Sequence, residues 1–266
     1  MINRIKNKIN FIYSNYKTKV LLNNYKFEKK KNLIRLGSVY GGWNLLDKKN
    51  LINSTILSCG LGEDASFDIE FAKKYNAKVI IIDPTPRSKI HYENIIHNIG
   101  KQKLKSYNPN GQQDVDCYDL SELSKENLFF IDKALYNKDN LELKFFKPPN
   151  VKEISHSINN WQNDYSNTSD SIIVSTITIE TILKQFNLIT LPLIKLDIEG
   201  AEIEVLEDIL IKNFRPNQIC VEFDELNKFT NKAEIRFLKI LKLLIVKKYE
   251  FIETNSSPNF LFNKID

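Results

Sequence analysis

The chain has 266 residues, of which 42% are hydrophobic and 27% are charged, with eight Gly, eight Pro and three Cys. These proportions are those of an ordinary folded protein and exclude collagen-like and low-complexity chains. The sequence contains neither an apolar run of roughly 18 residues, as a membrane span needs, nor a signal-peptide core. Its widely spaced cysteines argue against a disulfide scaffold or a zinc site. We therefore expect a cytoplasmic protein with one large α/β domain and added segments.

The net charge of +5 is concentrated at the N-terminus. Residues 1–31 carry nine Lys or Arg and one acid, Glu28, which leaves the remainder of the chain slightly acidic at −3. A protein that binds nucleic acid through its main domain would carry a basic face there. We therefore expect no stable nucleic-acid partner.

The basic N-terminal segment has a helical pattern. Ile5, Ile9 and Ile12 recur at intervals of three or four residues, which predicts a weakly amphipathic helix. We assign residues 1–36 to a basic helical arm and residues 37–266 to the main domain. The arm could contact an anionic partner or a membrane surface, but we favour a solvated helix as the simpler interpretation.

Further along the chain, strand and helix patterns alternate. The segment 33–47 is rich in glycine and aromatic residues, and we expect it to form an ordered loop. The later predicted elements are strands at 55–59, 78–82, 128–131, 141–146, 172–175, 193–196 and 218–223, helices at 65–76, 88–99, 178–186, 201–213 and 231–246, and a final hairpin at 249–253 and 259–262. This alternation predicts a mostly parallel sheet, to which the hairpin adds an antiparallel strand. In such sheets ligands bind at the carboxyl ends of the strands.

A glycine turn follows the first strand of this series. Gly60 and Gly62 allow a tight turn and a close approach of the backbone to a ligand. The next strand ends at Asp83, 23 residues after Gly60, where a carboxylate can accept hydrogen bonds from ribose hydroxyls. The cofactor-binding candidates are Ser58, Gly60, Gly62, Glu63, Asp64, Asp83 and Pro84. The alternative is a structural turn in which Asp83 caps the following helix.

The same turn indicates the kind of cofactor. The third glycine of a dinucleotide fingerprint is missing, and Asp64 and Phe67 stand where a pyrophosphate would need room. A carboxylate beside a pyrophosphate is repulsive, which disfavours NAD and FAD. S-adenosyl-L-methionine (SAM) has an adenosine without phosphates, and its positive sulfonium and amino groups would be attracted by Glu63 or Asp64. We therefore expect SAM as the cofactor.

A run of charged residues begins in the strand at 193–196. Lys195, Asp197 and Glu199 alternate with apolar residues and so share one side of the strand, where buried charges are costly unless they are paired or functional. We interpret Asp197 as a general base or acceptor-orienting group, with Glu199 beside it. The alternatives are a salt bridge to Lys195 and an Mg²⁺ site. Glu202 lies in the first turn of the next helix, where an acid is favourable without any further role.

Two further features complete the set of candidates. Glu222 lies at the end of the next strand, and its simplest interpretation is that it pairs with Lys195. The polar segment 148–171 contains His156 and Trp161, and a polar loop of this length predicts a lid or an acceptor loop. His156 is a candidate catalytic base, although a lone histidine in a polar loop is usually solvated.

Together these segments resemble the FkbM family of SAM-dependent methyltransferases. The resemblance is carried by residues 37–43, 58–68, 83–86, 195–202 and 221–223, and its most specific part is the KxDxEGxE string at 195–202. It implies an α/β class I methyltransferase fold, a Rossmann-like seven-stranded, mostly parallel sheet whose last strand is antiparallel. The chain departs from many members at Ser58, where they carry an acid.

The resemblance also implies an activity. Members commonly methylate hydroxyl groups, often on sugars or natural products, so we expect residues 37–266 to form an O-methyltransferase domain that acts in glycan biosynthesis on a sugar or glycan precursor. The alternatives are methyl transfer to RNA or to another small molecule, an NAD-linked Rossmann enzyme, and a methyltransferase-like module that only binds.

Overall fold

The computed structural model describes residues 2–146, 170–227, 230–254 and 259–265. His156, Trp161 and nearly all of the predicted lid at 148–171 therefore lie outside the described residues. No helix in the described part of the chain is long and apolar enough to cross a membrane.

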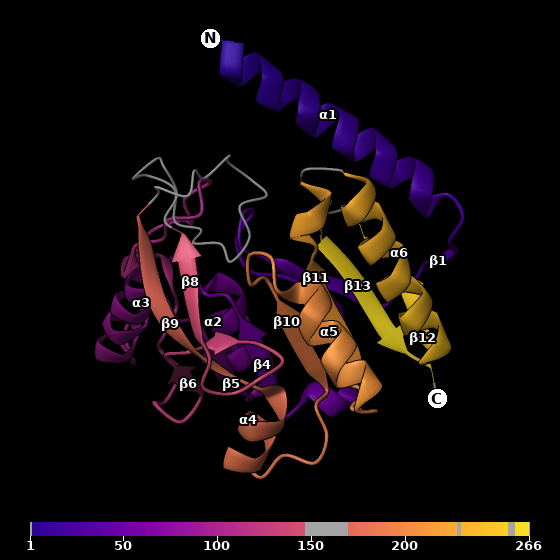
Figure 1. Cartoon of the computed structure of the whole chain (residues 1–266). Coiled ribbons are helices and arrows are strands. Elements are labelled where there is room, and N and C mark those ends of the chain that lie inside the picture. Colours follow the sequence, from indigo (N-terminus) through magenta and orange to yellow (C-terminus); the bar gives the residue numbers. More distant parts are fainter. Residues whose placement is uncertain (1, 147–169, 228–229, 255–258, 266) are drawn as a thin grey trace.

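The centre of the molecule is an eight-stranded sheet. Its strands, in spatial order, are β1 (Phe27–Glu28), β12 (Tyr249–Ile252), β13 (Asn259–Lys264), β11 (Gln218–Glu222), β10 (Leu193–Leu196), β4 (Thr55–Cys59), β5 (Lys78–Ile82) and β6 (Leu128–Ile131). Only β13 is antiparallel to its neighbours in this sheet. The arrow of β13 points down in Figure 1, so the carboxyl ends of the other strands face up, toward helix α1 (Ile2–Leu22). This arrangement confirms the class I methyltransferase fold, and β1 adds an eighth strand to it.

The two faces of the sheet are covered by different helices, which lie on opposite sides in Figure 1. Helices α2 (Ser66–Tyr75) and α3 (Pro86–His97) cover one face, and α4 (Ile179–Gln185), α5 (Glu202–Ile211) and α6 (Asn231–Val246) cover the other. Successive strand residues divide between the faces: Ile81 joins the core beneath α2, whereas Ile80 joins the core beneath α5 and α6. A strand that is apolar on both sides, such as β5, is expected where helices cover both faces.

The glycine-rich segment at 33–47 is a hairpin and not a loop. Strands β2 (Leu33–Leu36) and β3 (Trp43–Leu46) pair in antiparallel register, and residues 37–42 form the turn between them. The prediction was wrong because glycines dominate the segment, although Trp43 and Leu45 are fully buried in the core beneath α2. Their burial requires the extended backbone that the glycines concealed.

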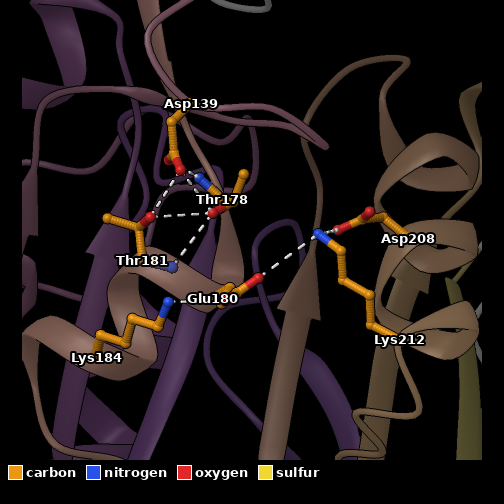
Figure 2. Close-up of polar contacts among 7 residues, drawn as sticks. All are labelled: Asp139, Thr178, Glu180, Thr181, Lys184, Asp208 and Lys212. Carbon is orange, nitrogen blue, oxygen red and sulfur yellow. Dashed lines mark hydrogen bonds and ion pairs between the residues drawn. The ribbon is translucent and has the colours of Figure 1, made fainter.

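A second, three-stranded sheet extends the fold. Strand β9 (Ser171–Ile177) pairs with β8 (Glu142–Phe146) and with β7 (Ala134–Leu135), so the strands predicted at 141–146 and 172–175 exist but stand outside the main sheet. The loop between β7 and β8 is fastened to α4, as Figure 2 shows. There Asp139 accepts hydrogen bonds from the Thr178 N–H (2.7 Å) and the Thr181 hydroxyl (2.7 Å), and Lys212 bridges Asp208 and Glu180.

Short turns and the N-terminal arm complete the description. Three-residue 3-10 helices occur at η1 (Lys49–Leu51), η2 (Val115–Cys117) and η3 (Asp224–Leu226). The predicted basic arm contains one long helix, α1, followed by β1. The division of the chain at residue 36 stays a prediction, and the pairing of β2 with β3 is a contact across it.

Candidate functional site

The candidate site lies at the carboxyl ends of β4 and β10, where the strand order reverses. Gly60 follows β4 with a left-handed backbone (φ +86°), and a Cβ atom at this position would overlap the carbonyl oxygen of Asp197. Only glycine therefore fits here. This contact joins the glycine turn to the KxDxEG segment, so two motifs separated by more than 130 residues, as Gly60 and Lys195 are, form one edge.

Asp83 holds the glycine turn in shape. Its carboxylate is 5% exposed; Oδ2 accepts hydrogen bonds from the N–H groups of Leu61 (2.9 Å) and Gly62 (3.1 Å). Oδ1 accepts from the N–H (2.8 Å) and the hydroxyl (2.6 Å) of Thr85. Both oxygens thus carry two hydrogen bonds, close to the full acceptor capacity of a carboxylate. Pro84, half-buried, lies between these partners.

The two acids after the glycines also have protein partners. Glu63 forms a two-pronged ion pair with Arg87 at the start of α3, with distances of 2.9 and 2.7 Å. Asp64 accepts hydrogen bonds from the Ser38 hydroxyl (2.6 Å) and the Gln113 side chain (3.1 Å). Asp64 therefore fastens the β2–β3 turn and the loop around Gln113 to the start of α2. Whether any of these acids also contacts a cofactor stays a prediction.

A buried lysine lies directly beneath the turn. In the sheet register Lys195 stands opposite Ser58 on one side and Cys220 on the other. Its ammonium donates a hydrogen bond to the carbonyl of Gly60 and lies 5.6 Å from the centre of the Trp43 ring. Among the described residues Lys195 forms no ion pair, so neither of its predicted partnerships, with Asp197 or with Glu222, is a direct salt bridge. Ser58 is fully buried in β4.

Two acids at the ends of β10 and β11 have raised pKa values. Burial raises the pKa of Asp197, the charge of Asp83 raises it further, and Lys195 opposes the shift. Burial raises the pKa of Glu222 to about 8, and the charges of Asp197 and Asp224 add to the shift. Neither carboxylate accepts a hydrogen bond from the described part of the chain. Both carboxyl groups therefore bind a proton more tightly than an exposed acid does, which is a property of many general bases.

The turn after Asp197 is held by Glu202. Glu199 has a left-handed backbone (φ +55°) and Gly200 follows at +108°, a conformation that non-glycine residues adopt at some cost. The Glu202 carboxylate accepts hydrogen bonds from the N–H groups of Ile198 (3.0 Å) and Gly200 (3.1 Å). Glu202 therefore orients the backbone on which Asp197 and Glu199 stand. Burial, with Asp224 and Glu225 nearby, raises the pKa of Glu202 well above its usual value.

Tyr40 is a site residue that the sequence alone did not indicate. It lies in the β2–β3 turn with 64% of its surface exposed, and a Cβ atom at Gly111 would overlap its ring. Burial of its hydroxyl raises the pKa of Tyr40, and the charges of Asp197, Glu199 and Glu222 raise it further. The phenol thus lies within electrostatic reach of the acid pair. The sequence signal that could have indicated Tyr40 is its aromatic side chain in a turn that is otherwise mostly glycine and serine.

No group of three or more His, Cys, Asp or Glu side chains in the described ranges is arranged to hold a metal ion. The Mg²⁺ alternative gains no support from this geometry.

One family model covers most of the chain. The family model described as "Methyltransferase FkbM domain" matches residues 6–252, and no curated protein sequence matches the chain. Similar solved structures include a fibrillarin/Nop5p complex (TM-score 0.40, 10% identity, 84% of this chain and 76% of that one). Two further examples are an rRNA methylase from Streptococcus thermophilus (TM-score 0.39, 11% identity, 82% of this chain and 91% of that one) and M. jannaschii TYW2 in complex with AdoMet (TM-score 0.33, 12% identity, 90% of each chain).

Proposed function

Because this chain belongs to the FkbM methyltransferase family, we propose that it transfers the methyl group of SAM to a hydroxyl oxygen of a sugar or glycan precursor. The observation that supports this proposal is the acidic pair of Asp197 and Glu222 beside the glycine turn, with both carboxyl groups raised in pKa. A hydroxyl must lose its proton to become methylated, and such a pair can accept that proton.

The charges at the edge fit SAM better than a phosphate-bearing cofactor. The strand ends there carry the carboxyl groups of Asp83, Asp197 and Glu222, whereas the neighbouring cations are engaged by the protein: Lys195 on the Gly60 carbonyl and Arg87 with Glu63. A sulfonium and an ammonium group would be attracted, and a pyrophosphate repelled. In our proposal the turn at Gly60 and Gly62 holds the cofactor, and Asp83, at the end of the next strand, keeps that turn in shape through its hydrogen bonds to Leu61 and Gly62.

The chain's own residues then supply positioning and proton removal. When bound, SAM supplies a methyl group on a sulfonium, which is a good leaving group. Asp197 accepts the proton of the acceptor hydroxyl while the oxygen–carbon bond forms and the carbon–sulfur bond breaks. Burial and the charge of Asp83 keep the proton affinity of Asp197 raised. Alignment of acceptor and donor contributes several kcal/mol in reactions of this kind, and a positioned base adds a factor of about 10² to 10⁴.

Tyr40 is the proposed acceptor platform. Its exposed ring stands on the turn that Asp64 fastens to the glycine loop, and a flat aromatic surface of this kind can stack on a sugar ring. The predicted roles of Glu199, of His156 and of the 148–171 segment as a lid remain proposals of the same kind. A cytoplasmic location agrees with three free, buried cysteines and also remains a proposal.

Calorimetry with SAM and with NAD tests the cofactor assignment. We expect binding of SAM and none of NAD. Release of S-adenosylhomocysteine is then measured with a panel of free sugars, nucleotide sugars, short RNAs and amino acids as acceptors. Release with a hydroxyl-bearing sugar supports the proposal. SAM binding with release only on RNA or on an amine would overturn the acceptor class, and absence of SAM binding would overturn the enzyme.

A further inference from the structure

Helix α1 presents an apolar face that nothing in the described structure covers. The side chains of Ile12, Tyr13, Tyr16 and Val20 are exposed by 58%, 50%, 64% and 43%. At 100° per residue these four positions fall within an arc of about 100°, the width of a single apolar stripe on a helix. A stripe of four large apolar residues in water is costly, so this face is expected to meet another surface.

The charges on α1 indicate what kind of surface its apolar stripe contacts. Within Ile2–Leu22 the helix carries no acid at all, and its basic residues are Arg4, Lys6, Lys8, Lys17 and Lys19. By helical spacing Lys17 and Lys19 border the stripe on its two sides. An apolar stripe with basic borders is the pattern of a helix that lies in the interface of an anionic membrane.

The opposite side of α1 attaches it to the protein near its C-terminal end. Ser14 is buried there, Leu21 and Leu22 pack against the core beneath α5 and α6, and the helix contacts η3. In Figure 1 the N-terminal part of the helix lies above the rest of the molecule and apart from it. The body therefore fixes the direction of the helix while the stripe stays on the outside.

We propose that α1 docks the protein on an anionic lipid surface, with Ile12, Tyr16 and Val20 in the headgroup boundary and the lysines on the lipid phosphates. Lipid accounts for both features of this face, because hydrocarbon takes the apolar side chains and anionic headgroups take the lysines. An RNA would use the lysines alone, and a second copy would bring equal positive charge against them.

The docking surface lies at the same end of the molecule as the candidate site. Helix α1 contacts η3, which directly follows β11 and Glu222, and the carboxyl ends of the parallel strands face α1 in Figure 1. Resting on the proposed function, this placement means that the acceptor is a hydroxyl compound held at a membrane surface, such as a lipid-linked sugar.

Sedimentation with vesicles tests the docking. The full chain is mixed with vesicles of phosphatidylcholine alone and of phosphatidylcholine with phosphatidylglycerol, at low and high salt. We expect binding to the anionic vesicles, weakened by salt. Ile12→Glu with Tyr16→Glu, and separately Lys17→Glu with Lys19→Glu, should each weaken binding about tenfold or more. Ile189→Glu is the matched control. This isoleucine is 93% exposed and lies in the segment before β10, at the end of the sheet away from α1.

Several outcomes would overturn the docking. These are a wild-type chain that stays in the supernatant, a double glutamate variant that binds as the wild type does, and a dimer that Ile12→Glu with Tyr16→Glu dissociates in the absence of vesicle binding. A salt-sensitive RNA shift without vesicle binding would identify nucleic acid as the partner instead. SAM calorimetry on the same variants separates the two proposals, because vesicle binding without SAM binding would leave the docking intact and remove the methyltransferase.

Discussion

The two halves of the candidate site use their acids in opposite ways. At the ends of β4 and β5, the carboxylates of Asp83, Glu63 and Asp64 all carry hydrogen bonds or ion pairs from the protein. At the ends of β10 and β11, Asp197 and Glu222 accept none from the described residues and have raised pKa values. Acids with satisfied partners shape a loop, whereas a close, unsatisfied pair can exchange a proton. The comparison separates a scaffold half from a reactive half.

The sharpest test of this contrast removes the charge of Asp197. Asp197→Asn should lower turnover by about 10² to 10⁴ while SAM affinity stays the same, because the amide cannot accept the proton. The matched control is Asp132→Asn, an exposed strand-end acid paired with Lys89 at 2.8 Å. Turnover is followed by S-adenosylhomocysteine release and affinity by calorimetry. Near wild-type turnover in Asp197→Asn would remove it as the base.

A second test breaks the scaffold half. From the sequence alone, Asp83→Ala should weaken cofactor binding and leave the thermal transition unchanged. The structure changes that expectation, since the variant leaves the buried N–H groups of Leu61 and Gly62 without an acceptor. We expect a loss of about 2–4 kcal/mol in unfolding free energy, measured in urea, together with lower SAM affinity. An unchanged urea midpoint would show that Asp83 does not hold the turn.

The pH dependence of stability tests the reactive half. The pKa of Glu222 is about 8 in the folded protein and ordinary when unfolded, so the folded state binds more protons between roughly pH 5 and 8. Stability should therefore fall as pH rises through this window. Glu222→Gln should flatten this slope, because the variant removes the carboxyl group whose pKa folding raises. Urea titrations at several pH values measure the slope, and an unchanged slope in the variant would contradict the raised pKa of Glu222.

The smallest effect is expected at the ion pair of the scaffold half. Arg87→Ala removes the partner of Glu63, but both side chains are partly exposed to water, so the loss should stay below about 1 kcal/mol. Lys184→Ala, which breaks an exposed pair with Glu180, serves as the control and should lie near zero. A loss as large as that of Asp83→Ala would mean that the ion pair, and not Asp83, positions the glycine turn.

Short-range sequence patterns predicted most of the fold. The apolar run of β5, the period of α5 and α6 and the closing hairpin of β12 and β13 are short-range signals, and the structure confirms each of them. The β2–β3 hairpin was missed because its burial depends on elements far along the chain: β3 packs against β11 and β13, and β2 against α2. Likewise β1 is a strand because it pairs with β12. A segment of two residues is too short to show a strand pattern in its own sequence.

For the site, the sequence by itself determined which residues stand at the strand ends: Gly60, Asp83, Asp197 and Glu222 follow from strand lengths and alternation. Only the tertiary structure decided what each acid does. Asp83 meets the N–H groups of Leu61 and Gly62, and Glu202 meets those of Ile198 and Gly200, whereas Asp197 faces another acid. A carboxyl group's proton affinity is set by burial and by the donors and charges around it, and those neighbours come from distant parts of the chain.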